Sequence, residues 1–226
     1  MNFTHKVLAV CIFLILGQCA FAQENEKAFT VELAGTFTHF EQQIKTEIGG
    51  VKGELLTADT ELGIQVVGTY KVWEFIHLGW YFQYDNGNRE NAQFSGFDSA
   101  GAAQVVNLQG GAYNEFWTGP LIRAQYKQAF LEVGYGLVGI RNDDAREDLV
   151  NTNGSNEGSL STDPSVAWLI GLGAQVNICE NLSLLVKAQY RVRYYNQRDG
   201  EELQNKAVHG TQNFTPLVGL SYKFQP

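Results

Sequence analysis

The chain has 226 residues, a formal net charge of −8, 12% aromatic residues and 24 glycines. The acidic balance argues against a nucleic-acid partner, because phosphate binding calls for a basic surface. After the N-terminal segment no apolar run approaches the ~20 residues of a membrane-spanning helix, and a lone remaining cysteine, Cys179, excludes an internal disulfide framework.

Residues 1–22 predict a secretory signal peptide. Lys6 gives a short basic start, residues 7–16 are apolar, and Ala20-Phe21-Ala22 forms an A-x-A cleavage site before Gln23. A lipoprotein signal at Cys19 is the alternative. Residues 23–226 are then expected to form one domain.

The first half of the mature chain predicts four strands, near 28–40, 61–72, 75–85 and 114–127. Each alternates apolar and polar residues with period two, which places one set on each face of a strand. In the first, Phe29, Val31 and Leu33 alternate with Thr30 and Glu32.

The second half continues the pattern near 129–141, 165–178, 182–195 and 214–224. The clearest case is 182–195, where Leu184, Val186 and Tyr190 oppose Lys187 and Arg191. In the last strand the apolar face ends in two aromatic residues, which are Tyr222 and Phe224.

The connections alternate between short and long. Short turns are expected near 71–74, 127–129 and 179–181, and long polar loops near 41–60, 86–113, 142–164 and 196–212. This plan predicts an all-β protein, an eight-stranded antiparallel up-and-down transmembrane β-barrel, with both termini periplasmic and the long loops external. A soluble β-sandwich, or a lipocalin-like barrel with its apolar face inward, is the alternative, and strands longer than ten residues disfavour it.

The strand count, the loop asymmetry and the terminal Tyr222-Lys223-Phe224 pattern resemble the small eight-stranded outer-membrane barrels of OmpA/OmpX type, common in Bacteroidetes-like Gram-negative bacteria. The resemblance covers essentially all of the mature chain. It implies outer-membrane lipid and lipopolysaccharide as surroundings, a monomer, and Tyr222 and Phe224 as the signal read by the barrel insertion machinery. This chain continues to Gln225-Pro226, whereas the family ends on the aromatic residue.

The polar face of the strands carries charges that should meet in the lumen. An eight-stranded barrel is just wide enough for side chains to fill, and buried charges must pair because an isolated one is very costly. We therefore expect a salt-bridged plug. A narrow or gated ion or small-solute path is the alternative. The residues expected in this network are Glu32, Glu61, Glu132, Arg123, Lys187, Arg191 and Arg193.

Other chemistry has weaker signals. The acidic run Asp143, Asp144, Glu147 and Asp148 is a weak candidate for divalent cations, but a solvated loop is the simpler interpretation. No histidine stands beside a serine at strand spacing, so no catalytic residue and no cofactor is expected, and a lipid-modifying enzyme is only a third alternative. The expected role is structural, or the presentation of loops to an external protein or surface ligand.

Overall fold

The computed structural model describes residues 28–48, 51–108, 111–143, 158–161, 166–198, 201–202 and 210–224. The predicted signal peptide lies outside these residues. Thirteen strands form one antiparallel sheet, with no helix among the described residues that is long and apolar enough to cross a membrane. The strands are β1 Phe29–Ile48, β2 Val51–Lys71, β3 Ile76–Phe97, β4 Ala103–Leu108, β5 Ala112–Tyr126, β6 Ala129–Tyr135, β7 Val138–Asp143, β8 Gly158–Ser161, β9 Val166–Asn177, β10 Leu182–Tyr194, β11 Gln197–Arg198, β12 Glu201–Glu202 and β13 Thr211–Phe224.

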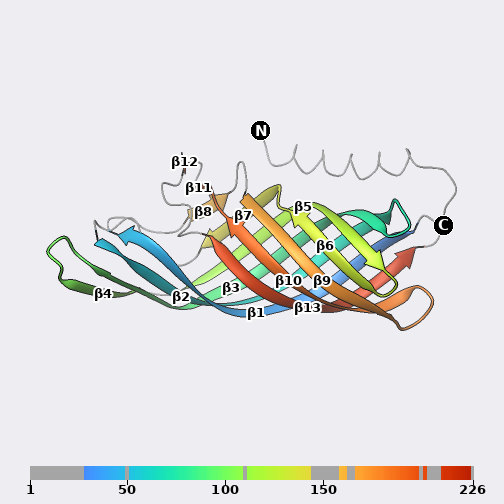
Figure 1. Ribbon diagram of the computed structural model, residues 1–226, viewed down its shortest axis with the longest axis horizontal. Helices are drawn as coiled ribbons and strands as arrows, with labels where there is room; N and C mark the ends of the chain where they lie inside the picture. The colour runs from blue at the N-terminus through green and yellow to red at the C-terminus, as the bar shows by residue number, and fades with distance from the viewer. Residues whose placement is uncertain are drawn as a thin grey trace.

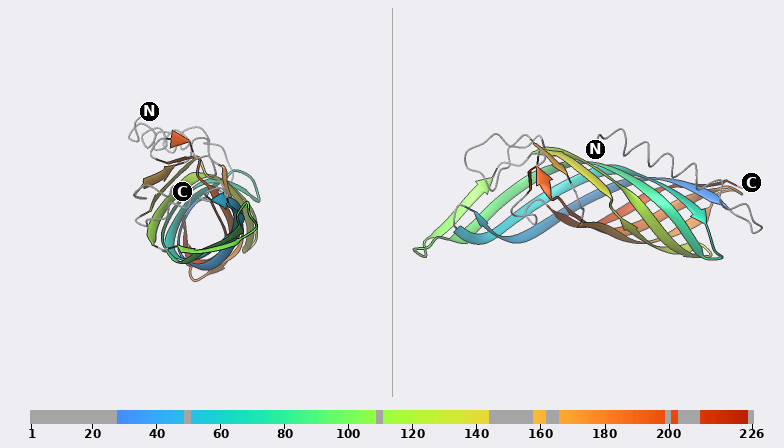
Figure 2. Two further views of the ribbon diagram at one scale, coloured as in Figure 1. Left: turned by 90° about the vertical axis from the view of Figure 1, so that its left-hand side faces the viewer. Right: turned by 90° about the horizontal axis from the view of Figure 1, so that it is seen from above.

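The sheet closes on itself into a ring of eight. β6 and β7 follow each other along the same edge of β5 and together count as one member of the ring. The order around the ring is β1, β2, β3, β5, β6/β7, β9, β10 and β13, and β13 pairs with β1. Figure 2 shows the ring end-on, and Figure 1 shows the tilt of the strands. The predicted eight-stranded antiparallel barrel is confirmed.

The predicted alternation is also confirmed. Along β1 the residues from Phe29 to Phe37 alternate between exposed and buried, with Leu33 55% and Phe37 59% exposed and Glu32 1% exposed. The exposed apolar stretch spans nine residues on β1 and eleven on β13, from Phe214 to Phe224. A tilted transmembrane strand needs about 9–11 residues, so this outer band has the height of a bilayer's apolar core.

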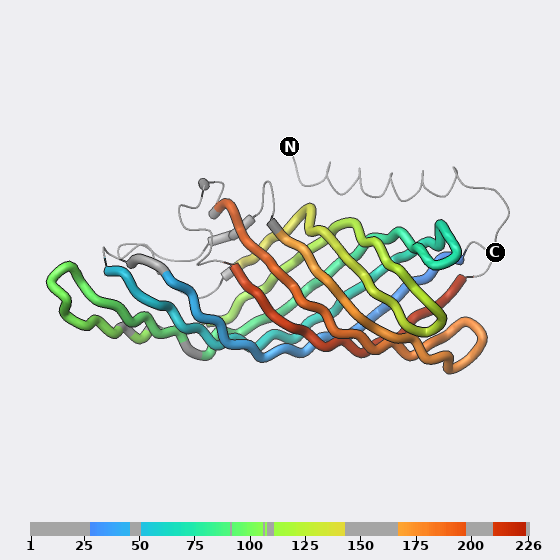
Figure 3. The backbone as a smooth tube through the Cα atoms, viewed as in Figure 1, coloured from blue at the N-terminus to red at the C-terminus, as the bar shows by residue number. Residues whose placement is uncertain are grey.

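Two of the predicted long loops are wrong, because strands occupy most of them. The segment 41–60 belongs to β1 and β2, which pair from Phe29 with Tyr70 up to Ile48 with Val51. The segment 86–113 holds the rest of β3 and all of β4. β1, β2, β3 and β4 extend together, as one sheet, well beyond the end of the other barrel strands (Figures 1 and 3).

The outer face explains the error. Beyond Phe37 on β1 the outward residues become polar, beginning with His39, Glu41 and Gln43. Hydrophobic periodicity is a strand signal only where one face meets an apolar phase, so a strand with polar residues outside resembles a loop. We call the part of β1–β4 beyond this boundary the sheet extension, which comprises residues 39–48, 51–60, 86–97 and 103–108.

The remaining differences are at boundaries. The predicted strand 129–141 is divided into β6 and β7 by a one-residue bulge, since Leu121 pairs with Gly134 but Thr118 pairs with Val138. The short strands β8, β11 and β12 lie in the other two predicted loops. The three short turns are found where they were expected, at one end of the barrel.

Candidate functional site: the charged lumen

The barrel interior holds the principal concentration of charge in the described part of the chain. The structure places all seven predicted network residues on the lumen face, each less than 5% exposed. They come from β1, β2, β5, β6 and β10, because alternate residues of every strand face the axis.

Near the short turns, Arg123 on β5 forms the centre of a four-residue cluster. Its guanidinium binds both carboxylate oxygens of Glu32, with Nη2 2.8 Å from Oε2, and Nη2 also lies 2.6 Å from Glu132 Oε2. Lys187 Nζ lies 3.1 Å from Glu132 Oε1 and 3.5 Å from Glu32 Oε2. The two cations and two anions form a closed, neutral layer, and Phe130 packs under the guanidinium 4.1 Å from its centre.

A second cluster lies closer to the sheet extension and is built around Arg193. Its guanidinium pairs with Glu115, lies 3.1 Å from Asp85 Oδ2 and lies 3.8 Å from Glu61 Oε2. Arg141 Nη1 is 3.6 Å from Glu115 Oε1, and Arg191 Nη1 is 3.6 Å from Asp85 Oδ2. Neutral donors complete this cluster, because Tyr113 and Asn213 each donate a hydrogen bond to Glu61.

Glutamine side chains connect the two clusters. Gln189 donates to Glu132 Oε1 at 2.7 Å and accepts from Arg191 Nε at 3.1 Å. Arg191 in turn donates to Gln83, which donates to Asp85 at 2.6 Å. One continuous hydrogen-bonded chain therefore follows the alternate residues of β10 through the membrane-spanning part of the lumen.

The buried charges balance. Among the described residues six acidic and six basic side chains are buried in the interior, counting the Asp59–Arg89 pair at the start of the sheet extension. The acids are Glu32, Asp59, Glu61, Asp85, Glu115 and Glu132, and the bases are Arg89, Arg123, Arg141, Lys187, Arg191 and Arg193. Breaking a buried pair leaves an uncompensated charge. Loss of any one of these twelve side chains would therefore upset the charge balance of the interior.

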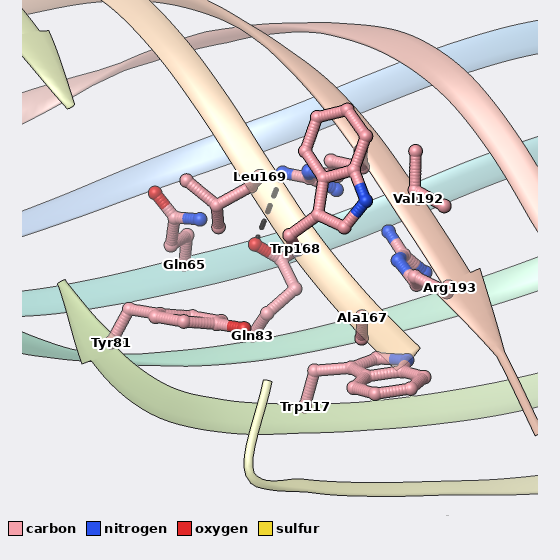
Figure 4. Close-up of a pocket in the computed structure, with 10 residues that line it drawn as sticks. Gln65, Tyr81, Gln83, Trp117, Ala167, Trp168, Leu169, Val192 and Arg193 are labelled. Atoms are coloured by element: carbon pink, nitrogen blue, oxygen red, sulfur yellow. Dashed lines mark hydrogen bonds between the residues drawn. The ribbon is translucent and has the colours of Figure 1, made fainter. Parts of the chain in front are cut away.

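Between the clusters lies a small space of about 20 Å³, lined by Tyr81, Gln83, Trp117, Leu169 and Arg191, among others. Figure 4 shows the Trp117 indole, the Tyr81 ring and the Gln83 amide grouped around it. A cavity needs about 10–15 Å³ to hold one water. The space is therefore of water size.

Sequence reasoning missed five of these twelve buried charged groups, which are Asp59, Asp85, Arg89, Glu115 and Arg141. Asp85 and Glu115 share the parity of residues already assigned inward on their strands, so continuing the alternation would have found them. Asp59 and Arg89 lie in segments interpreted as loops. Arg141 follows the bulge between β6 and β7, which shifts the inward-facing positions by one residue.

The weak metal candidates lie largely outside the described residues. Asp143 ends β7, and Asp144, Glu147 and Asp148 are not described. Within the described ranges no three histidine, cysteine or acidic side chains are grouped as a metal site. Cys179 is exposed in the turn between β9 and β10.

The proposed assembly residues lie on the outer face at the end of β13. Tyr222 and Phe224 are 43% and 50% exposed, with ring centroids 4.8 Å apart, and Phe29 of β1 lies 5.9 Å from Phe224. The three rings form an aromatic cluster where the barrel closes.

No protein-family description matches the chain, and neither does any curated protein. Solved structures do match. Ail, the attachment invasion locus protein of Yersinia pestis, in complex with the heparin analogue sucrose octasulfate, is 12% identical, covers 89% of this chain and 100% of its own, and has a TM-score of 0.45. The outer membrane protein OprG of Pseudomonas aeruginosa is 12% identical over 90% and 98% of the two chains, with a TM-score of 0.49. The outer membrane protease OmpT of Escherichia coli is 11% identical over 88% and 96%, with a TM-score of 0.37.

Proposed function

We propose that this outer-membrane β-barrel protein is a sealed, non-enzymatic scaffold of OmpA/OmpX type that holds the sheet extension outside the cell for contact with a protein or surface ligand. The observation that carries the proposal is the continuation of β1, β2 and β3 beyond the apolar band. The band ends at Phe37 on β1 and Leu62 on β2, and the strands then continue to the hairpin at Ile48 and Val51.

The sheet extension has its own apolar core on the inner face. Leu55 and Phe94 are buried, with Ile44 and Val51 packed against them. Its outer face is mostly polar, with Leu56 46% and Phe97 66% exposed as apolar contact points. A rigid sheet positions such groups better than a mobile loop does, because less conformational entropy is lost on binding.

The extension also has strand edges. β1 pairs with β2 along its whole length, but its described pairs with β13 end at Thr36, so one edge of β1 has no described strand partner beyond that residue. β3 pairs with β5 as far as Asn88 and with β4 from Ala92 onward. Strand edges offer backbone donors and acceptors to an extended peptide, which supports a contact function for this part of the molecule.

The orientation in this proposal has a direct test. Lys45 and Lys52 are exposed on the extension, while Lys71, Lys127 and Lys223 are at the short-turn end. Intact cells treated with a membrane-impermeant amine reagent should be modified at Lys45 and Lys52 but not at Lys71, Lys127 or Lys223, as read by peptide mass spectrometry. Lysed cells provide the control for reactivity. Modification of Lys71 or Lys223 in intact cells would reverse the orientation.

A narrow channel is the second candidate, since Lys187, Gln189, Arg191 and Arg193 form a continuous polar row along the lumen face of β10. Planar-bilayer recording of the purified protein separates the two. A sealed scaffold gives no unitary current steps. Steps whose ion selectivity changes in Arg193→Gln would establish the channel and contradict the scaffold.

A further inference from the structure

The lumen opens at the short-turn end into a second, larger cavity. Its volume is about 310 Å³, at the lower limit of ordinary ligand pockets, which run from about 300 to 1,000 Å³. Its charged and titratable lining comprises Lys71, His77, Lys127, Lys223, Glu74 and Glu180. We call this cavity the basal vestibule. The neutral Glu32–Arg123 layer lies deeper in the same lumen, and Gln175 connects the two, because it lines the vestibule and donates to Glu32 Oε1 at 2.7 Å.

The vestibule differs electrostatically from the rest of the lumen. Deeper cations such as Arg123 and Lys187 are each bound to carboxylates. Among the described residues, none of the ammonium groups of Lys71, Lys127 and Lys223 has a carboxylate oxygen within 4.0 Å. Three lysines against two glutamates leave the vestibule positive in a chain whose net charge is −8.

A buried histidine adds a second, independent observation. His77 lies on the lumen face of β3, its ring lines the vestibule, and the side chain is only 9% exposed. Its Nδ1 has no hydrogen-bond partner among the described residues. Several other buried side-chain atoms of the described residues, such as Thr38 Oγ1 and Trp117 Nε1, also lack a hydrogen-bond partner. What distinguishes the His77 imidazole is its place in the wall of a cavity large enough for a ligand.

The lining favours an anion over a cation. Lysine ammonium groups are donors only, and the side-chain amide of Asn181 adds a further donor. A metal ion would instead need several carboxylate, imidazole or thiolate ligands together, and no such group occurs among the described residues. Phosphate carries close to two charges and strong acceptor oxygens, and lysine binds it as a point charge.

We propose that the basal vestibule binds a phosphate group, supplied either by a free phosphate-bearing solute or by the headgroup of a phospholipid in the adjacent leaflet. Lys71 and Lys223 supply the charge from β2 and β13. They lie on the lumen face of strands that both pair with β1. His77 lies on the neighbouring strand β3 and completes the donor set.

The test uses the full mature protein in a zwitterionic detergent, with inorganic phosphate as the probe and isothermal titration as the readout. The wild type should bind phosphate saturably, and Lys71→Gln/Lys223→Gln should bind at least tenfold more weakly. The control is Lys45→Gln/Lys52→Gln, which removes the same charge from the outer face of the sheet extension and should leave the affinity unchanged. Heat-modified gel mobility verifies that each variant is folded.

His77→Gln supplies a second variant that retains all of the lysines, and a weaker phosphate affinity in this variant supports the site. Nanodiscs distinguish the sources of phosphate. Competition by phosphatidylglycerol against free phosphate identifies the headgroup, and equal binding in phosphatidylglycerol and detergent identifies a free solute. The proposal is overturned if the wild type shows no saturable binding, or if the control pair weakens binding as much as the vestibule pair.

Discussion

Arg123 and Glu32 stand 91 residues apart in sequence, yet they form a two-point ion pair across the lumen of the barrel. Both side chains are almost inaccessible to solvent. The pair joins β1 to β5, which are not neighbours in the sheet, so it fixes the cross-section of the barrel from within.

Loss of Arg123 should therefore be severe. Arg123→Met leaves Glu32 and Glu132 facing each other with Lys187 alone between them, and an uncompensated buried charge costs about 3–5 kcal/mol. Urea unfolding in detergent micelles or vesicles measures the change. Lys45→Met, which removes an exposed cation from the sheet extension, should shift stability by no more than about 0.5 kcal/mol. Equal stability of the two variants would contradict the importance of the lumen pair.

Two glycines on paired strands offer a matched steric comparison. A Cβ on Gly219, on the lumen side of β13, would lie 2.0 Å from the Leu33 carbonyl oxygen and 2.5 Å from Ala34 Cα. A Cβ on Gly35, on the lipid side of β1, would come no closer than 3.9 Å to Val218 O. Gly219→Ala should destabilise by about 1–3 kcal/mol through overpacking, while Gly35→Ala should be tolerated. Refolding yield and the urea midpoint test this, and similar values for both variants would show that the close approach on the lumen side is absent.

The turn between β3 and β4 should be acid-sensitive. Asp98 Oδ1 accepts hydrogen bonds from the backbone amides of Ala102 and Ala100, at 2.8 and 2.9 Å, and the bond from Ala102 is the main reason that the pKa of Asp98 lies below its ordinary value. A lowered pKa in the folded state means that the stabilisation is present at neutral pH and is lost as the pH falls through that lowered value.

Amide hydrogen exchange at Ala100 and Ala102 should therefore be more protected at neutral pH than in acid, after correction for intrinsic exchange. In Asp98→Ala this pH dependence should disappear. A turn with the same protection in wild type and Asp98→Ala at neutral pH would show that the carboxylate does not hold it.

The end of β13 is predicted to be the assembly signal. Phe224→Ala should lower the amount of folded barrel in the outer membrane, because it removes the ring that contacts both Tyr222 and Phe29. Phe214→Ala is the control, since Phe214 is exposed on the same face at the other end of the strand. Quantitative blotting of folded and unfolded forms measures the result, and equal effects of the two substitutions would remove the special role of the C-terminal residue.

The sequence predicts this fold well where lipid lies on one side of a strand. Leu33 and Glu32 differ in exposure because one meets acyl chains and the other meets the lumen, and a period of two records that difference. The same rule fails at Glu41 and Gln43, where the outer face of β1 is polar instead of apolar, so the sheet extension lacked the row of outward apolar residues that marks the rest of the strand.

The sequence does not predict which charged side chains pair with each other across the lumen. Parity alone places Arg123 and Glu32 inside, but the choice of partner depends on strand tilt and register around the whole ring. Arg141 shows the same limit, since a bulge between β6 and β7 reverses its expected side. Local sequence carries little information about either.

The central claim is that the odd residues of β13 fill the lumen and the even residues meet lipid. Single spin labels on a Cys179→Ser background test this claim in lipid vesicles, with oxygen and a water-soluble nickel chelate as relaxing agents. The labelled even positions are Phe214, Val218 and Leu220, and the labelled odd positions are Thr215, Leu217 and Ser221. The account predicts high oxygen accessibility at the even positions only. Labels at the odd positions should respond weakly to both agents. High oxygen accessibility at the odd positions, or no alternation along the strand, would contradict it.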